Sequence, residues 1–380
     1  MSEYQYYEFR TIDRPLTETE IDTLGSISTR AEITSTSFTN DYEWGDLKAD
    51  PLKLLEKYFD AFVYVANWGT RRFWLRLPKG WIDYEKVKRM LSGDTVGVRR
   101  TGKHVIVGFE ISELELNDFD DGTGWMGSLV SLRSDLLRGD FRCLYLGWLL
   151  CAQIGELGDG QREPAVPAGL RQLTAPLRSL IDFLCIDEDL VGAAAATSAR
   201  LNAGRGHQEL ETWIRSLPES EKTNLLVTAA SESGEQWKNE LFARFYRENQ
   251  RPAPPGTASQ PRTVGDLLSA AEAMAKERAR KLAAERAIEL ARQKAEEEAS
   301  RARYLDLLGK REEATWDQAT ELIQKKQPKA YDQAIKLLID LHDLAIRQGA
   351  EAVFRARIQS LREKHFAKTG FLRRLESADL

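Results

Sequence analysis

Residues that commonly build catalytic and metal sites are scarce in this chain of 380 residues. It contains three cysteines and four histidines, none at the spacing of a zinc site. Cys143, Cys151 and Cys185 stand among apolar residues, which indicates buried, reduced thiols. A glycine-rich phosphate loop is missing, and so is the Gly-x-Ser-x-Gly turn of hydrolases. We therefore expect no catalytic residue, metal or cofactor, although an enzyme whose site residues are dispersed along the chain stays an alternative.

Long apolar runs are absent as well. No stretch of about 18 apolar residues occurs, so no membrane-spanning helix is expected. The first residues, MSEYQYYEFR, lack the basic start and apolar core of a secretory signal peptide. Together with the reduced cysteines, this predicts a cytoplasmic protein without a membrane partner. The net charge of −5 does not favour wholesale coating of nucleic acid, but the charge is unevenly distributed along the chain.

Strands and helices are interleaved in the first third of the sequence, which predicts an α+β domain at 1–124. Runs rich in alternating, aromatic and β-branched residues predict strands at 4–12, 31–44, 61–78 and 103–116. The run at 61–78 is expected to be a hairpin that turns at Gly69, since glycine takes the positive φ of a tight turn. Helices are expected at 16–27, 50–60 and 83–91.

All-α regions follow this domain. Residues 125–248 are predicted to form a helical domain, whose first long helix breaks near Gly139. A linker at 249–264 has three prolines in four residues and then Gly, Ser and Thr, which disfavours packing.

A long charged helix is predicted at 265–314. Its acidic and basic residues are spaced four apart with the acid first, as in the pair Glu272 and Lys276. Its apolar stripe is thin, which favours a single solvated helix of roughly 40 residues, about 60 Å long. A coiled coil is the alternative.

The last segment, 315–380, is predicted to be a C-terminal helical hairpin module. Its helix around 329–349 carries a wide apolar face that includes Tyr331, Ile335 and Leu338. His342 borders that face, and no carboxylate of the same helix is placed to orient its ring. Packing or partner contact is therefore the expected role of this face. The candidate partner-binding residues are Tyr331, Ile335, Leu338, His342 and Phe354.

This tail, residues 328–380, resembles the tail of bacterial SWIM-type zinc-finger proteins. The resemblance rests on a helix of the form Tyr-Asp-x-Ala-x-x-Leu-Leu-x-x-Leu, on Phe-x-x-Arg, and on a Lys-x-x-x-Leu-x-Arg-Leu end. The matching residues are Tyr331, Asp332, Ala334, Leu337, Leu338 and Leu341, then Phe354 and Arg357, then Lys368, Leu372, Arg374 and Leu375. The family's zinc motif is absent from this chain, so the resemblance implies a helical module and no zinc site. That family is associated with DNA-related and protein–protein interactions. The remainder, from the opening YYEFRTIDRPLT, resembles an uncharacterised bacterial family and implies no function.

One stretch of the first domain is strongly basic. Residues 70–104 contain ten Lys or Arg against three Asp or Glu, with aromatic residues among them. Cations beside exposed rings are typical of a groove for single-stranded nucleic acid. The alternation in this stretch, however, favours aromatic rings in the core with a rim of solvated cations. The candidate nucleic-acid-binding residues are Trp68, Arg71, Arg72, Trp74, Arg76, Trp81, Arg99, Arg100 and Lys103.

Two hypotheses of function follow. The favoured one is a non-enzymatic adaptor that presents the C-terminal module to an unknown protein partner. The alternative is a nucleic-acid-associated protein that binds through 68–104.

Overall fold

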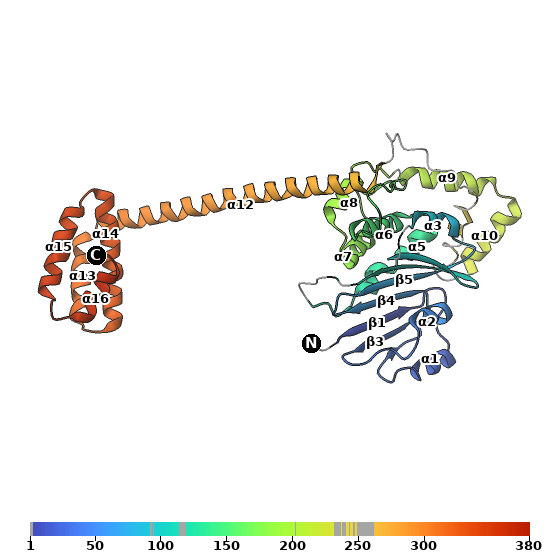
Figure 1. Cartoon of the computed structure of the whole chain (residues 1–380), viewed down its shortest axis with the longest axis horizontal. Helices are drawn as coiled ribbons and strands as arrows, with labels where there is room; N and C mark the ends of the chain where they lie inside the picture. Colours follow the sequence, from blue (N-terminus) through green and yellow to red (C-terminus); the bar gives the residue numbers. More distant parts are fainter. Residues whose placement is uncertain are drawn as a thin grey trace. The chain divides into compact units, whose positions relative to one another are not determined.

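The chain forms an α+β region followed by helices, as predicted, and divides into two compact units, Met1–Arg278 and Ala279–Leu380. The computed structural model (Figure 1) describes residues 3–91, 93, 95–112, 114, 119–201, 203–231, 237, 241, 242, 244, 245, 248 and 262–380. In these ranges, no helix is both long enough and apolar enough to cross a membrane.

A seven-stranded sheet organises the first unit, and every neighbouring pair of its strands is antiparallel. Its strand order is β2-β3-β1-β4-β5-β7-β6. The strands are β1 (Gln5–Arg10), β2 (Glu32–Ile33), β3 (Ser37–Tyr42), β4 (Ala61–Ala66), β5 (Arg71–Pro78), β6 (Val96–Arg100) and β7 (His104–Ile111).

The predicted strands are confirmed with two differences, except that residues 113, 115 and 116 of the run at 103–116 lie outside the described residues. The run at 31–44 forms two strands, because the chain turns where the Thr34 amide donates to the Ser37 carbonyl. Strand β6 was not expected. The predicted hairpin is β4 and β5, and Gly69 takes a φ of +84° in its turn.

Helices cover both faces of the sheet, and local sequence explains where several begin. Asp50 caps α2 through the Leu52 amide, with Pro51 in the first turn. The helices up to residue 195 are α1 (Glu18–Gly25), α2 (Pro51–Tyr58), α3 (Tyr84–Met90), α4 (Trp125–Leu129), α5 (Leu132–Leu137), α6 (Arg142–Gln153), α7 (Ala175–Leu184) and α8 (Glu188–Ala195). The expected break near Gly139 separates α5 from α6, and a further break separates α4 from α5.

Each face of the sheet has its own apolar core. On one face, called the α6 side, residues of α3 to α8 pack against Phe73, Leu75 and Val107. On the other, called the α2 side, residues of α1 and α2 pack against Phe9, Phe62 and Tyr64. The predicted helical domain at 125–248 thus contributes α4 to α8 to the core of the sheet, and α9 (Ala203–Ser216) and α10 (Glu219–Ser231) follow them.

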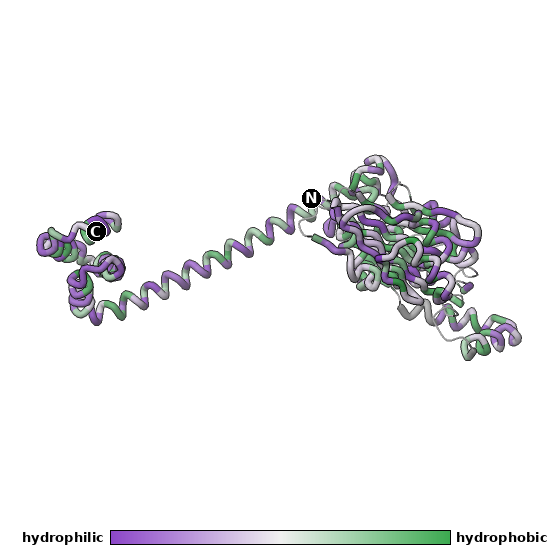
Figure 2. The backbone as a smooth tube through the Cα atoms, turned by 90° about the horizontal axis from the view of Figure 1, so that it is seen from below, coloured by the Kyte–Doolittle hydropathy of each residue, from purple (hydrophilic) through white to green (hydrophobic). Residues whose placement is uncertain are grey.

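The long helix α12 (Val264–Gly309) has 46 residues, or about 69 Å at 1.5 Å per residue. It begins in the first unit, where Val264, Leu267 and Ala271 are buried in the α6-side core. Residues 276–300 are all exposed. Figure 2 shows hydrophilic residues along the whole helix with hydrophobic ones between them, as expected for a solvated helix.

The second unit has four helices beyond the end of α12, rather than a single hairpin. These are α13 (Glu312–Gln324), α14 (Pro328–Gln348), α15 (Glu351–Lys364) and α16 (Thr369–Ser377). Gly349 ends α14 in the left-handed conformation, with a φ of +69°. A separate core includes Leu308, Trp316, Ala334, Leu338 and Phe371, so this unit buries its own apolar surface.

Candidate binding face of the sheet

Strand alternation divides the nine basic and aromatic candidates between the two faces of the sheet. Arg71 lies on the α6 side, where its guanidinium donates to the Phe183 carbonyl (2.8 Å) and pairs with Asp120 (2.7 Å). Trp81 packs on the α6-side core. The Arg100 guanidinium lies over the Tyr84 ring, 4.2 Å from its centroid. These three side chains therefore contact the helical layer and do not reach the α2 side.

Arg76 points to the α2 side but is buried. Its guanidinium pairs with Asp60 (2.7 Å), which is 1% exposed and also accepts from the Ile12 and Asp13 amides. Arg133 of α5 pairs with Asp13 (2.7 Å) and donates to the Arg76 carbonyl (2.8 Å). This cluster of Asp13, Asp60, Arg76 and Arg133 joins the segment after β1, the residue before β4, strand β5 and helix α5. Its internal pairing indicates a structural role.

Four candidates remain on the α2 side, and Lys103 is exposed in the turn between β6 and β7. Trp68, Arg72, Trp74 and Arg99 line two adjacent hollows there. The sheet therefore brings together residues from β5, β6 and the β4–β5 turn. Sequence reasoning placed all nine on one site because it treated the basic stretch as continuous.

A row of aromatic rings crosses the α2 side toward the hollow that Trp74 and Arg99 line. The Phe9 ring lies 4.4 Å from the Phe62 ring, and the Phe62 ring lies 4.9 Å from the Trp74 ring. Beyond Trp74, the row continues across the strands: in the sheet register Trp74 is opposite Gly108 of β7, and Gly108 is opposite Gly97 of β6. The row of rings thus ends at two glycines: the Trp74 ring lies against Gly108, and the space above Gly97 is open.

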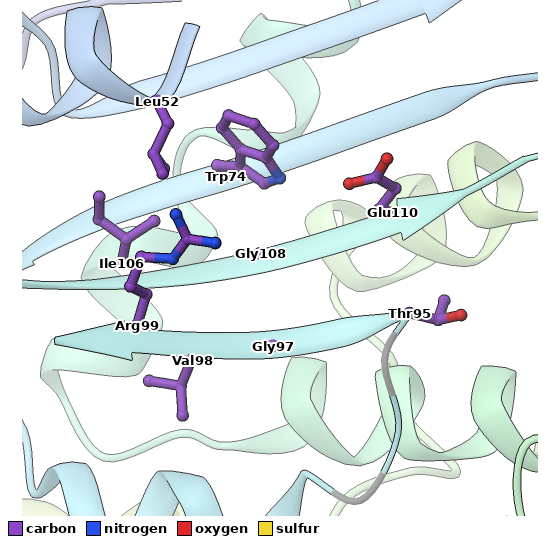
Figure 3. A pocket seen from close by; sticks show the side chains of 9 residues that line it. All are labelled: Leu52, Trp74, Thr95, Gly97, Val98, Arg99, Ile106, Gly108 and Glu110. Atoms are coloured by element: carbon purple, nitrogen blue, oxygen red, sulfur yellow. The ribbon is translucent and has the colours of Figure 1, made fainter. Parts of the chain in front are cut away.

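The hollow over these glycines, called the Gly97 groove, has a volume of about 210 Å³ (Figure 3). Gly97 and Gly108 form its floor, and Trp74 stands beside them. Arg99 lies toward one end, where its side chain extends across β7, and Glu110 lies toward the other. In the part of the chain that the structure describes, no hydrogen bond or ion pair involves the Arg99 guanidinium.

The second hollow is larger, about 590 Å³, and lies beside Trp68, Tyr64 and Arg72. Arg72 is not a free cation, since its Nε donates to Glu110 Oε1 (2.6 Å) and its guanidinium lies over the Tyr64 ring. Burial raises the pKa of Tyr64 to about 12, so its hydroxyl stays protonated at neutral pH. The carboxylates of Glu3 and Asp46 also line this hollow. Among the residues that the structure describes, the α2 side therefore has mixed charge and no continuous cationic track.

The structure directs most of the C-terminal candidates inward. Leu338 is fully buried, and Tyr331, Ile335 and Phe354 are each less than 10% exposed. His342 is half-buried, with its ring 5.0 Å from the Phe354 ring. The strongly apolar side chains that reach the surface of this unit's last helices are others, namely Ile339, Ile346, Val353 and Phe366. Helical spacing could have found Ile339 and Ile346, which are seven residues apart on the edge of the apolar face.

No group of three or more His, Cys, Asp or Glu within the described ranges is placed to hold a metal ion. Cys143 and Cys151 are buried, as predicted, but Cys185 is exposed at the end of α7. The resemblance of the tail to SWIM-type proteins stays a prediction. No protein-family model, no curated protein and no solved structure matches this chain.

Proposed function

We propose that this protein is a non-enzymatic adaptor whose C-terminal unit binds a protein partner. One observation carries the proposal: the unit closes its own core yet leaves Ile339 and Ile346 of α14 exposed, by 38% and 51%. Seven residues apart, they share one face of the helix. Large apolar side chains that repeat on one exposed helical face are typical of a surface that docks a partner.

Charge beside this face supports its use as a defined surface. Arg301 pairs with Asp340 and Asp343 (2.6 Å each), and Arg347 pairs with Asp306 (3.1 Å). Asp343 lies between Ile339 and Ile346 at helical spacing, so this face combines apolar side chains with paired charges, and protein–protein interfaces also combine apolar and polar residues. The resemblance of the tail to a family associated with protein–protein interactions agrees with this proposal.

The test compares two double variants of the full chain. Ile339→Lys with Ile346→Lys removes the two exposed isoleucines of α14. Ile288→Lys with Leu290→Lys makes the same chemical change on α12, where these residues are 70% and 55% exposed. We expect cross-linking in native lysate to capture specific proteins with the wild type and the α12 variant, and to lose them with the α14 variant. The same proteins captured by all three chains would contradict the proposal, once circular dichroism shows equal helicity.

A second candidate function is binding of single-stranded nucleic acid on the α2 side. The observation that favours it is the placement of Trp68, Trp74, Arg72 and Arg99 on one face. Only two of these residues are cations, so few phosphates would be neutralised.

Fluorescence anisotropy with labelled single strands tests this candidate. Each phosphate contact on a single strand contributes a slope of roughly −0.7 in log K against log salt, and Arg72 already pairs with Glu110, so Arg99 alone predicts a slope of about −0.7. Arg99→Gln is expected to weaken binding, whereas Arg100→Gln, on the opposite face of the same strand, is the matched control. Absence of binding at low salt rules this function out.

A further inference from the structure

Neither the backbone conformation at position 97 nor any described neighbouring atom requires glycine there. A Cβ added there would meet nothing within 4 Å, and its φ is not in the left-handed region. Glycine inside a strand weakens the strand, and it often marks a place where a ligand or another backbone approaches closely. The space that a side chain would fill at this position is the floor of the Gly97 groove.

Gly108, the partner of Gly97 across the strands, has a different surrounding. A Cβ there would lie 2.8 Å from Cδ1 of Trp74, so the indole lies close against the bare backbone of β7. The two glycines therefore do different things. Gly108 admits the Trp74 ring, and Gly97 leaves an open, flat surface beside it.

The size and shape of the groove restrict what it can hold. Its 210 Å³ is below the roughly 300–1,000 Å³ of sites for drug-sized ligands, so it accommodates about one ring system. A flat floor without side chains admits a planar group. Trp74 offers an aromatic surface, and aromatic groups attract one another in stacked or edge-to-face arrangements.

The charges at the groove favour an anion. Arg99 is exposed, and no counter-ion faces it among the described residues. Glu110 lies toward the other end, but its Oε1 accepts from Arg72, so its charge is partly balanced. A guanidinium binds carboxylate or phosphate through charge-assisted hydrogen bonds.

We propose that the Gly97 groove binds one planar aromatic or heteroaromatic ring that carries an anionic group. The ring lies on Gly97 beside Trp74, and the anion pairs with Arg99. A nucleotide and an aromatic carboxylate share this chemistry. If the source is a nucleotide, the inference deepens the second candidate function by giving it a site.

Isothermal titration of the full chain tests the proposal with defined probes. The planar anions are adenosine 5′-monophosphate and indole-3-carboxylate. Adenosine tests the need for the anion, and cyclohexanecarboxylate tests the need for the planar ring. Gly97→Val fills the groove, and Arg99→Gln removes its cation. Gly102→Val is the matched control for the first, since a Cβ at Gly102 also meets open space, and Arg100→Gln is the control for the second.

We expect at least one planar anion to bind and both groove variants to weaken it by about tenfold or more. The two control variants should leave its affinity within about twofold, which lies within the usual range for surface substitutions. Unchanged binding to Gly97→Val, or equal binding of cyclohexanecarboxylate, would overturn the proposal. Valine suits a strand and its Cβ meets no atom within 4 Å, so the variant should fold, and a thermal melt distinguishes loss of binding from unfolding.

The probes also separate this inference from the second candidate function. Binding of indole-3-carboxylate alone keeps the groove as a ligand site and counts against nucleic acid. Binding of a single-stranded oligonucleotide equally to the wild type and Gly97→Val, with no small probe bound, keeps nucleic acid and overturns the groove proposal. If nothing binds, both are wrong.

Discussion

Gly97 and Gly108 are opposite each other in the register of β6 and β7, but neighbouring atoms exclude a side chain only at Gly108. A Cβ at Gly108 would approach Cδ1 of Trp74 to 2.8 Å, closer than real Cβ atoms come, whereas one at Gly97 would touch nothing within 4 Å. The position of the Trp74 indole, and with it the wall of the Gly97 groove, therefore depends on Gly108.

Alanine at these two positions should have opposite effects on stability. Gly108→Ala forces Trp74 to move and should lower the free energy of unfolding by about 1–3 kcal/mol, the usual range for overpacking. Gly97→Ala should raise it by up to about 0.5–1 kcal/mol, because glycine in a strand is less favourable than alanine. Urea denaturation measures both values. Equal effects would show that Trp74 is not constrained by Gly108.

The buried carboxylate of Asp60 should be essential for the fold of the first unit. It is 1% exposed and faces Arg76 at 2.7 Å and Arg133 at 3.6 Å. Asp60→Asn leaves these two arginines with less counter-charge, and breaking a buried pair in this way costs about 3–5 kcal/mol. Glu85→Gln is the control, since Glu85 is exposed and lies 4.0 Å from Arg100. Glu85→Gln should lower the free energy of unfolding by less than about 1 kcal/mol. A similar loss of stability in both variants would contradict the structural role of the cluster.

The same cluster predicts how stability responds to acid. Burial alone would raise the pKa of Asp60, but the charges of Arg133 and Arg76 outweigh burial and hold this pKa below its usual value. A carboxyl with a lowered pKa in the folded state stabilises the protein above its unfolded pKa, about 3.9, and this contribution is lost as pH falls through the folded pKa. The contribution of Asp13 to the pH dependence of stability has the opposite sign, because burial raises the pKa of its carboxyl.

Unfolding of the wild type and Asp60→Asn should therefore be compared across pH. The difference in unfolding free energy is expected to be largest above about pH 4 and to narrow in more acidic solution. Chemical denaturation at pH 7, 5, 4 and 3 measures this difference. A constant difference over that range would mean that the charge of Asp60 does not stabilise the fold.

Sequence reasoning succeeded where local patterns decide the outcome. The alternation of Phe73, Trp74 and Leu75 predicted their faces, and Gly69 predicted the turn of the hairpin. It missed β6, a five-residue strand that has only two large apolar residues, Val96 and Val98, with Gly97 between them. That strand supplies Gly97 and Arg99, so the groove could not be found without it.

The sequence also could not predict which residues far apart in the chain would pair in the folded protein. Arg71 belongs to the basic stretch, yet its two terminal guanidinium nitrogens donate to Asp120 and to the Phe183 carbonyl, the latter 112 residues away. In the tail, periodicity identified the apolar face of α14 correctly. It could not show that the other helices of the same unit cover Leu338 and leave Ile339 exposed.

The ion pair of Arg262 with Glu163 should strengthen the docking of the first turns of α12 on the first unit. Arg262 donates two hydrogen bonds to Glu163, each 2.8 Å, and a third to the Ala193 carbonyl (2.9 Å). Arg262→Met should destabilise the docking of 262–271 by about 1.5–3 kcal/mol per charged hydrogen-bond partner lost. Hydrogen exchange in the first turns of α12 would report this as faster exchange. Arg278→Met is the control, since Arg278 is more exposed and, within the described residues, its ion pair is with Asp189 alone. Equal protection in the wild type and Arg262→Met would contradict the anchoring role.

A cavity in the core of the second unit should lower the stability of that unit and leave the stability of the first unit unchanged. Leu338 is fully buried in the core of the second unit, so Leu338→Ala should cost about 2–5 kcal/mol there. Ile339→Ala, at the next position and 38% exposed, is the matched control and should change stability by less than about 1 kcal/mol. Because the first unit has its own cores, its hydrogen-exchange protection should be unchanged in both variants. Loss of protection in the sheet of Leu338→Ala would show that the units unfold together, which would make the C-terminal unit a part of the body rather than a self-sufficient module for a partner.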